Sequence, residues 1–128
     1  MSHPKQIVST PQAPPAMGPY SQGVVGGGLV FTAMQLGLDP ATEQLASGGI
    51  QAETRRVLEN QQAVLEAAGS SLDKAVKVTV YLADLADFGP MNEVYAHFFP
   101  ADRPARSVVQ VAAMPRNARI AVEMIALK

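Results

Sequence analysis

The longest helical pattern in the sequence runs from Ile50 to Ala68 and constrains the fold more than any other segment. The side chains suited to a core recur every three or four residues, at Ile50, Val57, Leu58, Gln61, Val64, Leu65 and Ala68. The polar side chains of Glu53, Arg56, Glu59 and Asn60 lie elsewhere on the circumference. Such a stripe predicts an amphipathic helix that packs one face on a core. Gly69 then supplies the left-handed residue that commonly ends a helix.

Segments with a period of two flank this helix and predict strands. After it, Val76, Val78, Val80 and Leu82 alternate with Lys77, Thr79 and Tyr81. Before it, residues 22–25 and 29–33 enclose Gly26-Gly27-Gly28, a pattern typical of a β-hairpin. Gly89-Pro90 opens a second helix over 91–99, Pro100 ends it, and two further strands are expected at 106–112 and 119–127.

The expected order is therefore β-hairpin, helix, strand, helix, strand, strand. This order indicates the α+β class, a sheet with two helices packed on one face. A doubly wound parallel sheet would need more strand–helix repeats than 128 residues hold.

Length and composition indicate one domain that assembles with copies of itself. The 128 residues suffice for a single domain spanning 1–128 and are too few for two of ordinary size. Only 16% of the residues are charged, against roughly 25% in an average soluble domain. Since a small domain normally covers its surface with charge, this deficit predicts that part of the surface is buried in an oligomer.

Charge, cysteine content and the N-terminal segment exclude several classes. The 10 basic and 11 acidic residues give a net charge of −1, which argues against nucleic-acid binding by clustered cations. The absence of cysteine excludes disulfides, thiolate nucleophiles and Cys-ligated zinc. Residues 1–15 are rich in proline, which predicts an extended arm and does not fit a secretion signal. No apolar run is long enough to span a membrane, so we expect a soluble cytoplasmic protein.

The common enzyme signatures are absent from the sequence. The GxGxxG, GxxxxGK[ST], HExxH and GxSxG motifs do not occur. Glu93 and His97 lie one helical turn apart and could touch a metal, but two ligands without a third make a poor site. An exposed i,i+4 pair is the favoured interpretation, and no metal is expected.

Two charged residues on the last two strands are the main candidates for a site. Glu123 is the lone carboxylate of the apolar strand 119–127, and Arg106 shares a strand face with Val108. A structural ion pair, or charges on edge strands, would explain both. Alternatively, the guanidinium grips a substrate carboxylate while Glu123 moves a proton or orients water. Tyr20, at a loop end, is by itself more typical of packing than of a site.

A series of short motifs follows in order between about Pro15 and Ala126. They are Gly18-Pro19-Tyr20-Ser21-Gln22, Gln35 with Leu38-Asp39-Pro40-x-Thr42, Glu66-Ala67-Ala68-Gly69, Val76-Lys77-Val78-Thr79-Val80-Tyr81-Leu82, Asn92-x-x-Tyr95-x-x-Phe98-Phe99, Pro104-Ala105-Arg106-Ser107 and Val122-Glu123-x-Ile125-Ala126. Together they resemble the Rid (YjgF) family of enamine/imine deaminases. The Pro-Ala-Arg-Ser motif followed by the Glu-x-Ile-Ala strand is the most diagnostic pair.

The resemblance implies both a fold and an activity. It implies a chorismate-mutase-like α+β fold that assembles as a trimer, with a central barrel and clefts between adjacent subunits. It implies hydrolysis of reactive 2-imino and 2-enamino acids to 2-oxo acids and ammonia, without cofactor or metal. Within the family pattern, Arg106 holds the substrate carboxylate and Glu123 orients the hydrolytic water. Tyr20 and Asn92 match residues that line the cleft, and Val108 matches a position that contributes mainly backbone groups.

One segment departs from the family pattern. The chain reads Ala33-Met34-Gln35 where the family usually reads Ser-Gly-Gln, so a hydroxyl is missing and a thioether replaces a glycine beside the site. We expect Ala33 and Met34 to narrow the cleft. The departure favours an alternative, a non-catalytic trimer that binds small carboxylates, whereas Arg106 and Glu123 favour the deaminase. A third function, a ribonuclease or translation inhibitor, is opposed by the near-neutral charge.

Overall fold

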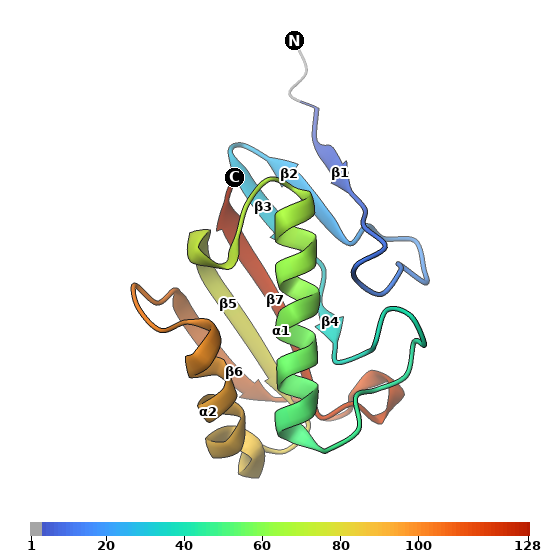
Figure 1. The fold of residues 1–128 in the computed structure, drawn as a ribbon, viewed down its shortest axis with the longest axis vertical. Helices are drawn as coiled ribbons and strands as arrows, with labels where there is room; N and C mark the ends of the chain where they lie inside the picture. Colours follow the sequence, from blue (N-terminus) through green and yellow to red (C-terminus); the bar gives the residue numbers. More distant parts are fainter. Residues whose placement is uncertain (1–3) are drawn as a thin grey trace.

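The computed structural model describes residues 4–128, which form one mixed sheet with two helices on one of its faces (Figure 1). The strands are β1 (Gln6–Val8), β2 (Gly23–Gly26), β3 (Leu29–Thr32), β4 (Gln35–Leu36), β5 (Ala75–Leu82), β6 (Ala105–Gln110) and β7 (Ile120–Leu127). The helices are α1 (Ile50–Ala67) and α2 (Phe88–Phe98), and short 3-10 turns lie at Leu72–Lys74, Leu85–Asp87 and Pro115–Asn117. The α+β class expected from the sequence is confirmed.

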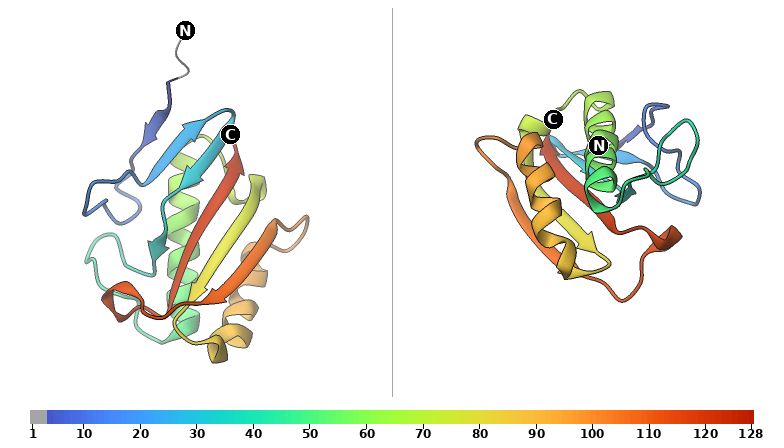
Figure 2. Two further views of the ribbon diagram at one scale, coloured as in Figure 1. Left: turned by 180° about the vertical axis from the view of Figure 1, so that it is seen from behind. Right: turned by 60° about the horizontal axis from the view of Figure 1, so that its bottom comes forward.

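The last strand of the sequence lies at the centre of the sheet. The strand order is β1-β2-β3-β7-β5-β6, and β4 also pairs with β7. All neighbours are antiparallel except β5 and β6, which are parallel and are joined through α2. Seen from behind, the sheet carries no helix on its other face (Figure 2). The sheet therefore has a helix-covered face, which holds the core, and an open face.

The hairpin and both helices form where the sequence predicts them, with shifted ends. Gly27 and Gly28 have φ of 59° and 78° between β2 and β3, a left-handed pair that favours glycine. The second helix begins at Phe88, three residues before its expected start. Pro90 then lies in the first turn, where its missing N–H has no intrahelical partner to lose.

Several strand boundaries differ from the expectation. The strand expected over 106–112 ends at Gln110, and β4 was not expected. The proline-rich arm, expected to be extended, contains strand β1, which pairs with β2 and buries Val8. Residues 1–3 of that arm lie outside the described residues. Pairing with a neighbouring strand, and not a local propensity, makes these two short segments strands.

The expected apolar stripe of α1 is buried in full, but two residues assigned to its polar side are buried as well. Glu53 is 6% exposed and Asn60 is fully buried. The Oε1 of Glu53 accepts the backbone N–H of Arg119 at 2.9 Å, and Nδ2 of Asn60 donates to the carbonyls of Leu36 and Leu38 at 3.0 and 2.9 Å. These bonds replace water, so the two polar side chains can lie against the sheet.

Gln61 is the third polar side chain that ties α1 to the sheet. Its Nε2 donates to the carbonyl of Ala33 at 3.1 Å and to that of Val122 at 2.6 Å. Nearby, Gly37 runs so close to the helix that a Cβ on it would lie 2.7 Å from the carbonyl oxygen of Glu53. The segment from β3 to β4 is therefore held against α1 by backbone contact and by side-chain amides.

Replacement of Gln61 by Leu is expected to destabilise the fold. A similar volume is kept, but the buried carbonyl of Val122 and the partly buried carbonyl of Ala33 lose this donor. An unsatisfied buried polar group costs about 1–3 kcal/mol, so the free energy of unfolding should fall by at least ~1 kcal/mol. Urea denaturation at one fixed chain concentration measures this change.

Gln62→Leu is the matched control for this variant. Gln62 is the next residue, is only partly buried and bonds the exposed Glu66, so its replacement should change stability by less than about 0.5 kcal/mol. Equal losses in the two variants would contradict the role given to the Gln61 amide.

Candidate active site

Arg106 lies on the helix-covered side of β6, which is an edge strand of the sheet. Its guanidinium donates a hydrogen bond from Nη1 to Oδ1 of Asn92 at 2.6 Å. The guanidinium carbon lies 4.6 Å from the ring centre of Tyr95 and 5.5 Å from that of Phe88. Both rings attract the cation through their π faces. The α2 side chains therefore orient the guanidinium without neutralising its charge.

The cleft around Arg106 has about 300 Å³ of free volume and is lined by Asn92, Tyr95, Ala96, Arg103, Pro104 and Arg106. Within residues 4–128 the salt bridges are Arg56–Glu59 and Arg119–Asp87, so Arg106 has no acidic partner there. Arg103 adds a second guanidinium, whose Nε donates to the carbonyl of Phe99 at 2.7 Å. A cleft with two guanidinium groups and no carboxylate is suited to an anionic ligand.

Tyr95 contributes a buried hydroxyl to the same cleft. This oxygen has no hydrogen-bond partner among the described residues. Burial raises the pKa of Tyr95, while the positive charges of Arg106 and Arg103 act in the opposite direction. A buried polar group without a partner is unusual, and here it borders the cleft that Arg106 lines. The sequence indicated Tyr95 only as part of the motif Asn92-x-x-Tyr95-x-x-Phe98-Phe99 and gave it no role of its own.

Glu123 lies on the open face of the sheet. In β7 it is paired with Thr79 of β5, and its Oε1 accepts a hydrogen bond from the hydroxyl of Tyr81 at 2.5 Å. It borders a hollow of about 220 Å³ lined by Phe31, Thr32, Lys77, Thr79, Glu123, Met124 and Ile125. The hydrogen bond to Glu123, together with partial burial and the charge of Glu123, raises the pKa of Tyr81 above 10.0. The phenol therefore remains a donor at neutral pH.

Arg106 and Glu123 do not meet within one chain. The register aligns Val78 with Arg106 and Thr79 with Glu123, and Val78 and Thr79 are adjacent in β5. Because adjacent strand residues point to opposite faces, the sheet itself separates the two charged groups. The prediction of a structural ion pair is therefore wrong within one chain. Of the two charged residues, only Arg106 lies on an edge strand.

Two more of the expected site residues lie near Arg106. Asn92 contacts it directly, and Val108 follows two residues later on the same face of β6. Val108 is partly buried and packs against the core. The structure thus brings Asn92, Arg106 and Val108 to one side of the sheet.

The remaining expected residues lie elsewhere on the chain. Tyr20 is 53% exposed, borders a hollow formed with the N-terminal arm, and accepts the backbone N–H of Met17 at 3.4 Å. Ala33 is partly buried and Met34 is 39% exposed, between β3 and β4. Neither the cleft of Arg106 nor the hollow of Glu123 is lined by these three residues.

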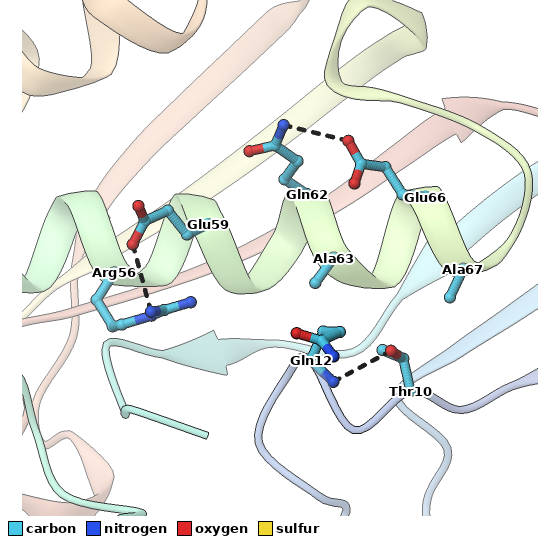
Figure 3. A pocket seen from close by; sticks show the side chains of 8 residues that line it. All are labelled: Thr10, Gln12, Arg56, Glu59, Gln62, Ala63, Glu66 and Ala67. Carbon is cyan, nitrogen blue, oxygen red and sulfur yellow. Dashed lines mark hydrogen bonds and ion pairs between the residues drawn. The ribbon is translucent and has the colours of Figure 1, made fainter. Parts of the chain in front are cut away.

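A larger groove, of about 570 Å³, separates α1 from the segment that follows β1 (Figure 3). Arg56 is paired with Glu59 at 3.4 Å, and Nε2 of Gln62 donates to Glu66 at 3.2 Å. Because Arg56 is paired with Glu59, this groove presents no counterpart of the unpaired Arg106. In the described part of the chain, no group of three or more His, Cys, Asp or Glu could hold a metal ion. No described helix is long and apolar enough to cross a membrane.

Known proteins share this sequence and this fold. The 2-iminobutanoate/2-iminopropanoate deaminase of Homo sapiens is 42% identical over 97% of this chain and 90% of its own. Reactive Intermediate Deaminase A, chloroplastic, of Arabidopsis thaliana is 49% identical over 95% of this chain and 65% of its own. The crystal structure of E. coli TdcF with bound serine matches with a TM-score of 0.92 and 42% identity, over 96% of this chain and 98% of that one.

The family itself follows from a match that spans nearly the whole chain. Residues 10–128 match the family model described as Endoribonuclease L-PSP. The fold shared with the solved structures is the chorismate-mutase-like α+β fold that the motifs implied. The chain therefore belongs to the Endoribonuclease L-PSP family, which is the Rid (YjgF) family that its motifs resemble.

Proposed function

We propose that the protein hydrolyses small 2-imino and 2-enamino acids to 2-oxo acids and ammonia. The observation that carries the proposal is the guanidinium of Arg106, which has no acidic partner in residues 4–128 and is oriented by Asn92 and Tyr95 beside a small cleft. A guanidinium held in this way can bind a carboxylate through two parallel hydrogen bonds. The names of the human and Arabidopsis relatives support a 2-imino acid as the bearer of that carboxylate.

The proposed reaction adds water across the C=N bond of the substrate. Arg106 binds the carboxylate beside Asn92 and Val108. We propose that Tyr20, Ala33 and Met34 complete the lining only where a neighbouring subunit closes the cleft. Glu123 accepts a proton from a water molecule while the water oxygen bonds to C2 of the protonated imine. The π electrons of the C=N bond move to nitrogen, which gives a neutral carbinolamine. Glu123 then returns this proton to the amine nitrogen, the C–N bond breaks, and the hydroxyl loses its proton to Glu123 as the carbonyl forms. Ammonia and a 2-oxo acid leave, and no cofactor or metal takes part.

We further propose that each site combines Arg106 of one subunit with Glu123 of the next subunit in a homotrimer. The opposite faces of the two residues support this arrangement, since a small substrate cannot span the sheet. The open face also exposes apolar side chains, with Phe31 43%, Val109 44% and Leu127 51% accessible. Together with the 16% charged residues, these side chains support burial of this face between subunits.

The alternative function is a trimer that binds small carboxylates without catalysis. It would be indicated if the wild-type protein bound 2-oxobutanoate but did not accelerate hydrolysis of 2-iminobutanoate.

The single domain over 1–128 and the cytoplasmic location remain predictions of the sequence.

Light scattering tests the trimer and should give about three times the chain mass of 13.5 kDa.

Mixed trimers test the composite site. Arg106→Ala and Glu123→Gln should each keep only a small residual rate alone, yet their co-expression in equal amounts should raise the activity well above that rate. In a ring with random mixing, about a quarter of the clefts combine the intact Arg106 of one subunit with the intact Glu123 of its neighbour. Activity that stays at the level of the separate variants would contradict a site shared between chains.

Arg106→Ala should lower kcat/KM strongly in a coupled assay that generates 2-iminopropanoate in place and follows the 2-oxo acid. Loss of a preorganised charged donor costs on the order of 2–4 kcal/mol, hence roughly 30- to 1,000-fold. Arg106→Lys should recover little activity, because an ammonium cannot form the planar, bidentate contact with a carboxylate. Arg55→Ala, on the exposed side of α1, removes the same charge and should leave the rate unchanged. Activity of Arg106→Ala within twofold of wild type would rule out the role.

The double variant Ala33→Ser with Met34→Gly should raise activity, and more for long or branched 2-imino acids than for 2-iminopropanoate. The change restores a hydroxyl and removes the side chain of Met34, whose crowding would cost about 1–3 kcal/mol for larger substrates. The exclusion is expected to be partial, since Met is flexible. Relative rates measured across a chain-length series check this expectation. Unchanged ratios would show that neither residue shapes the pocket.

A further inference from the structure

Tyr81 is the side chain that contacts Glu123, and neither the motifs nor the proposed reaction assigns it a role. Tyr81 is paired across the sheet with Ala121, two residues before Glu123 on β7. The two side chains are thus diagonal neighbours on the same face of the sheet. Long side chains in such positions can reach each other. They do so here with 2.5 Å between the phenol oxygen and Oε1 of Glu123.

The side chains around Glu123 determine which groups can donate a hydrogen bond to it. Phe31, Met124 and Ile125 border the same hollow and offer no side-chain hydrogen-bond donor. Lys77 is the only other titratable side chain lining the hollow, and its Nζ donates to Ser107 of β6 at 2.8 Å. Two threonines also line the hollow: Thr32 donates to the carbonyl of Met124 at 3.3 Å, and Thr79, paired with Glu123 in the sheet, forms no side-chain hydrogen bond to it. Among residues 4–128, Tyr81 is the side chain that donates to Glu123. One hydrogen bond to Oε1 fixes the carboxylate while Oε2 stays available.

A phenol hydrogen bond changes a carboxylate in two ways. It selects one orientation of the carboxylate, and it stabilises the ionised form over the protonated form. Because the same bond raises the pKa of Tyr81, the phenol keeps its proton and does not compete as a base. The contact thus holds the carboxylate in one orientation, with Oε2 left for water.

We propose that Tyr81 is a positioning residue of the deamination, which holds Oε1 of Glu123 so that the ionised Oε2 faces the hydrolytic water. The inference rests on the proposed function, because it assumes that Glu123 handles that water. Tyr81 does not touch the substrate in this arrangement. Substrate binding stays with Arg106 of the neighbouring subunit, so the two contributions are separable in kinetics.

Tyr81→Phe removes the hydroxyl alone and is the decisive variant. We expect kcat for 2-iminopropanoate to fall about tenfold with KM nearly unchanged, since only the step that uses Glu123 is affected. Arg55→Ala, on the exposed side of α1 and far from Glu123, is the control and should alter neither kcat nor KM.

A double-mutant cycle tests whether Tyr81 acts through Glu123. In the Glu123→Gln background, Tyr81→Phe should cause no further loss of the residual rate. One measurement does not depend on turnover. The pKa of Tyr81, followed by phenolate absorbance, should fall towards 10.0 in Glu123→Gln.

Each outcome decides between the two proposals. An inactive wild-type protein would overturn the proposed function and the positioning role with it. An active wild-type protein whose Tyr81→Phe variant keeps its kcat would overturn the role of Tyr81 alone. An equal loss in the wild-type and Glu123→Gln backgrounds would also overturn it, because Tyr81 would then act independently of Glu123. A tenfold loss in kcat confined to the wild-type background, with KM nearly unchanged, would support it.

Discussion

The register of β7 is the constraint on which the rest of the structure depends. This strand is hydrogen-bonded to β3, β4 and β5, so its alternation decides which side chains enter the core. Val122 and Met124 are buried against the helices, and Glu123 between them points to the open face. A slip of one residue would bury the carboxylate among apolar side chains and expose its neighbours. The cost of burying that charge fixes the register, and the register in turn sets Glu123 diagonally beside Tyr81.

Helix α1 holds this register by polar contacts as well as by its apolar stripe. The amides of Asn60 and Gln61 donate to carbonyls of the segment from Ala33 to Leu38, and Gln61 also donates to Val122 of β7. Apolar packing tolerates small sliding motions, whereas a buried donor must meet its acceptor or lose most of the bond. These contacts therefore fix the position of the chain on both sides of Glu123.

Local patterns predicted the elements, and long-range pairing decided the rest. The period of α1, the alternation of β5 and the glycine turn each depend on neighbouring residues, so the sequence indicated them correctly. β1 and β4 are strands only because β2 and β7 pair with them, and Glu53 and Asn60 are buried only because backbone groups reach them. The alternation within each strand was readable, but the register between strands was not. For that reason the sequence indicated Arg106 and Glu123 as site candidates but did not show that they lie on opposite faces. No pattern in the sequence indicated the contact between Tyr81 and Glu123.

The separation of the two charges has a chemical consequence for the proposed reaction. An arginine and a glutamate on the same face of neighbouring strands would pair, and each would then have to release the other before it could act. Here the sheet keeps them apart: Arg106 has no acidic partner within residues 4–128, and Glu123 bonds the neutral hydroxyl of Tyr81. In the proposed trimer the substrate carboxylate would be the partner that satisfies the guanidinium, while the carboxylate of the next subunit stays ionised for water. Assembly would thus create the site, and each chain alone would keep the two reactive groups out of reach of each other.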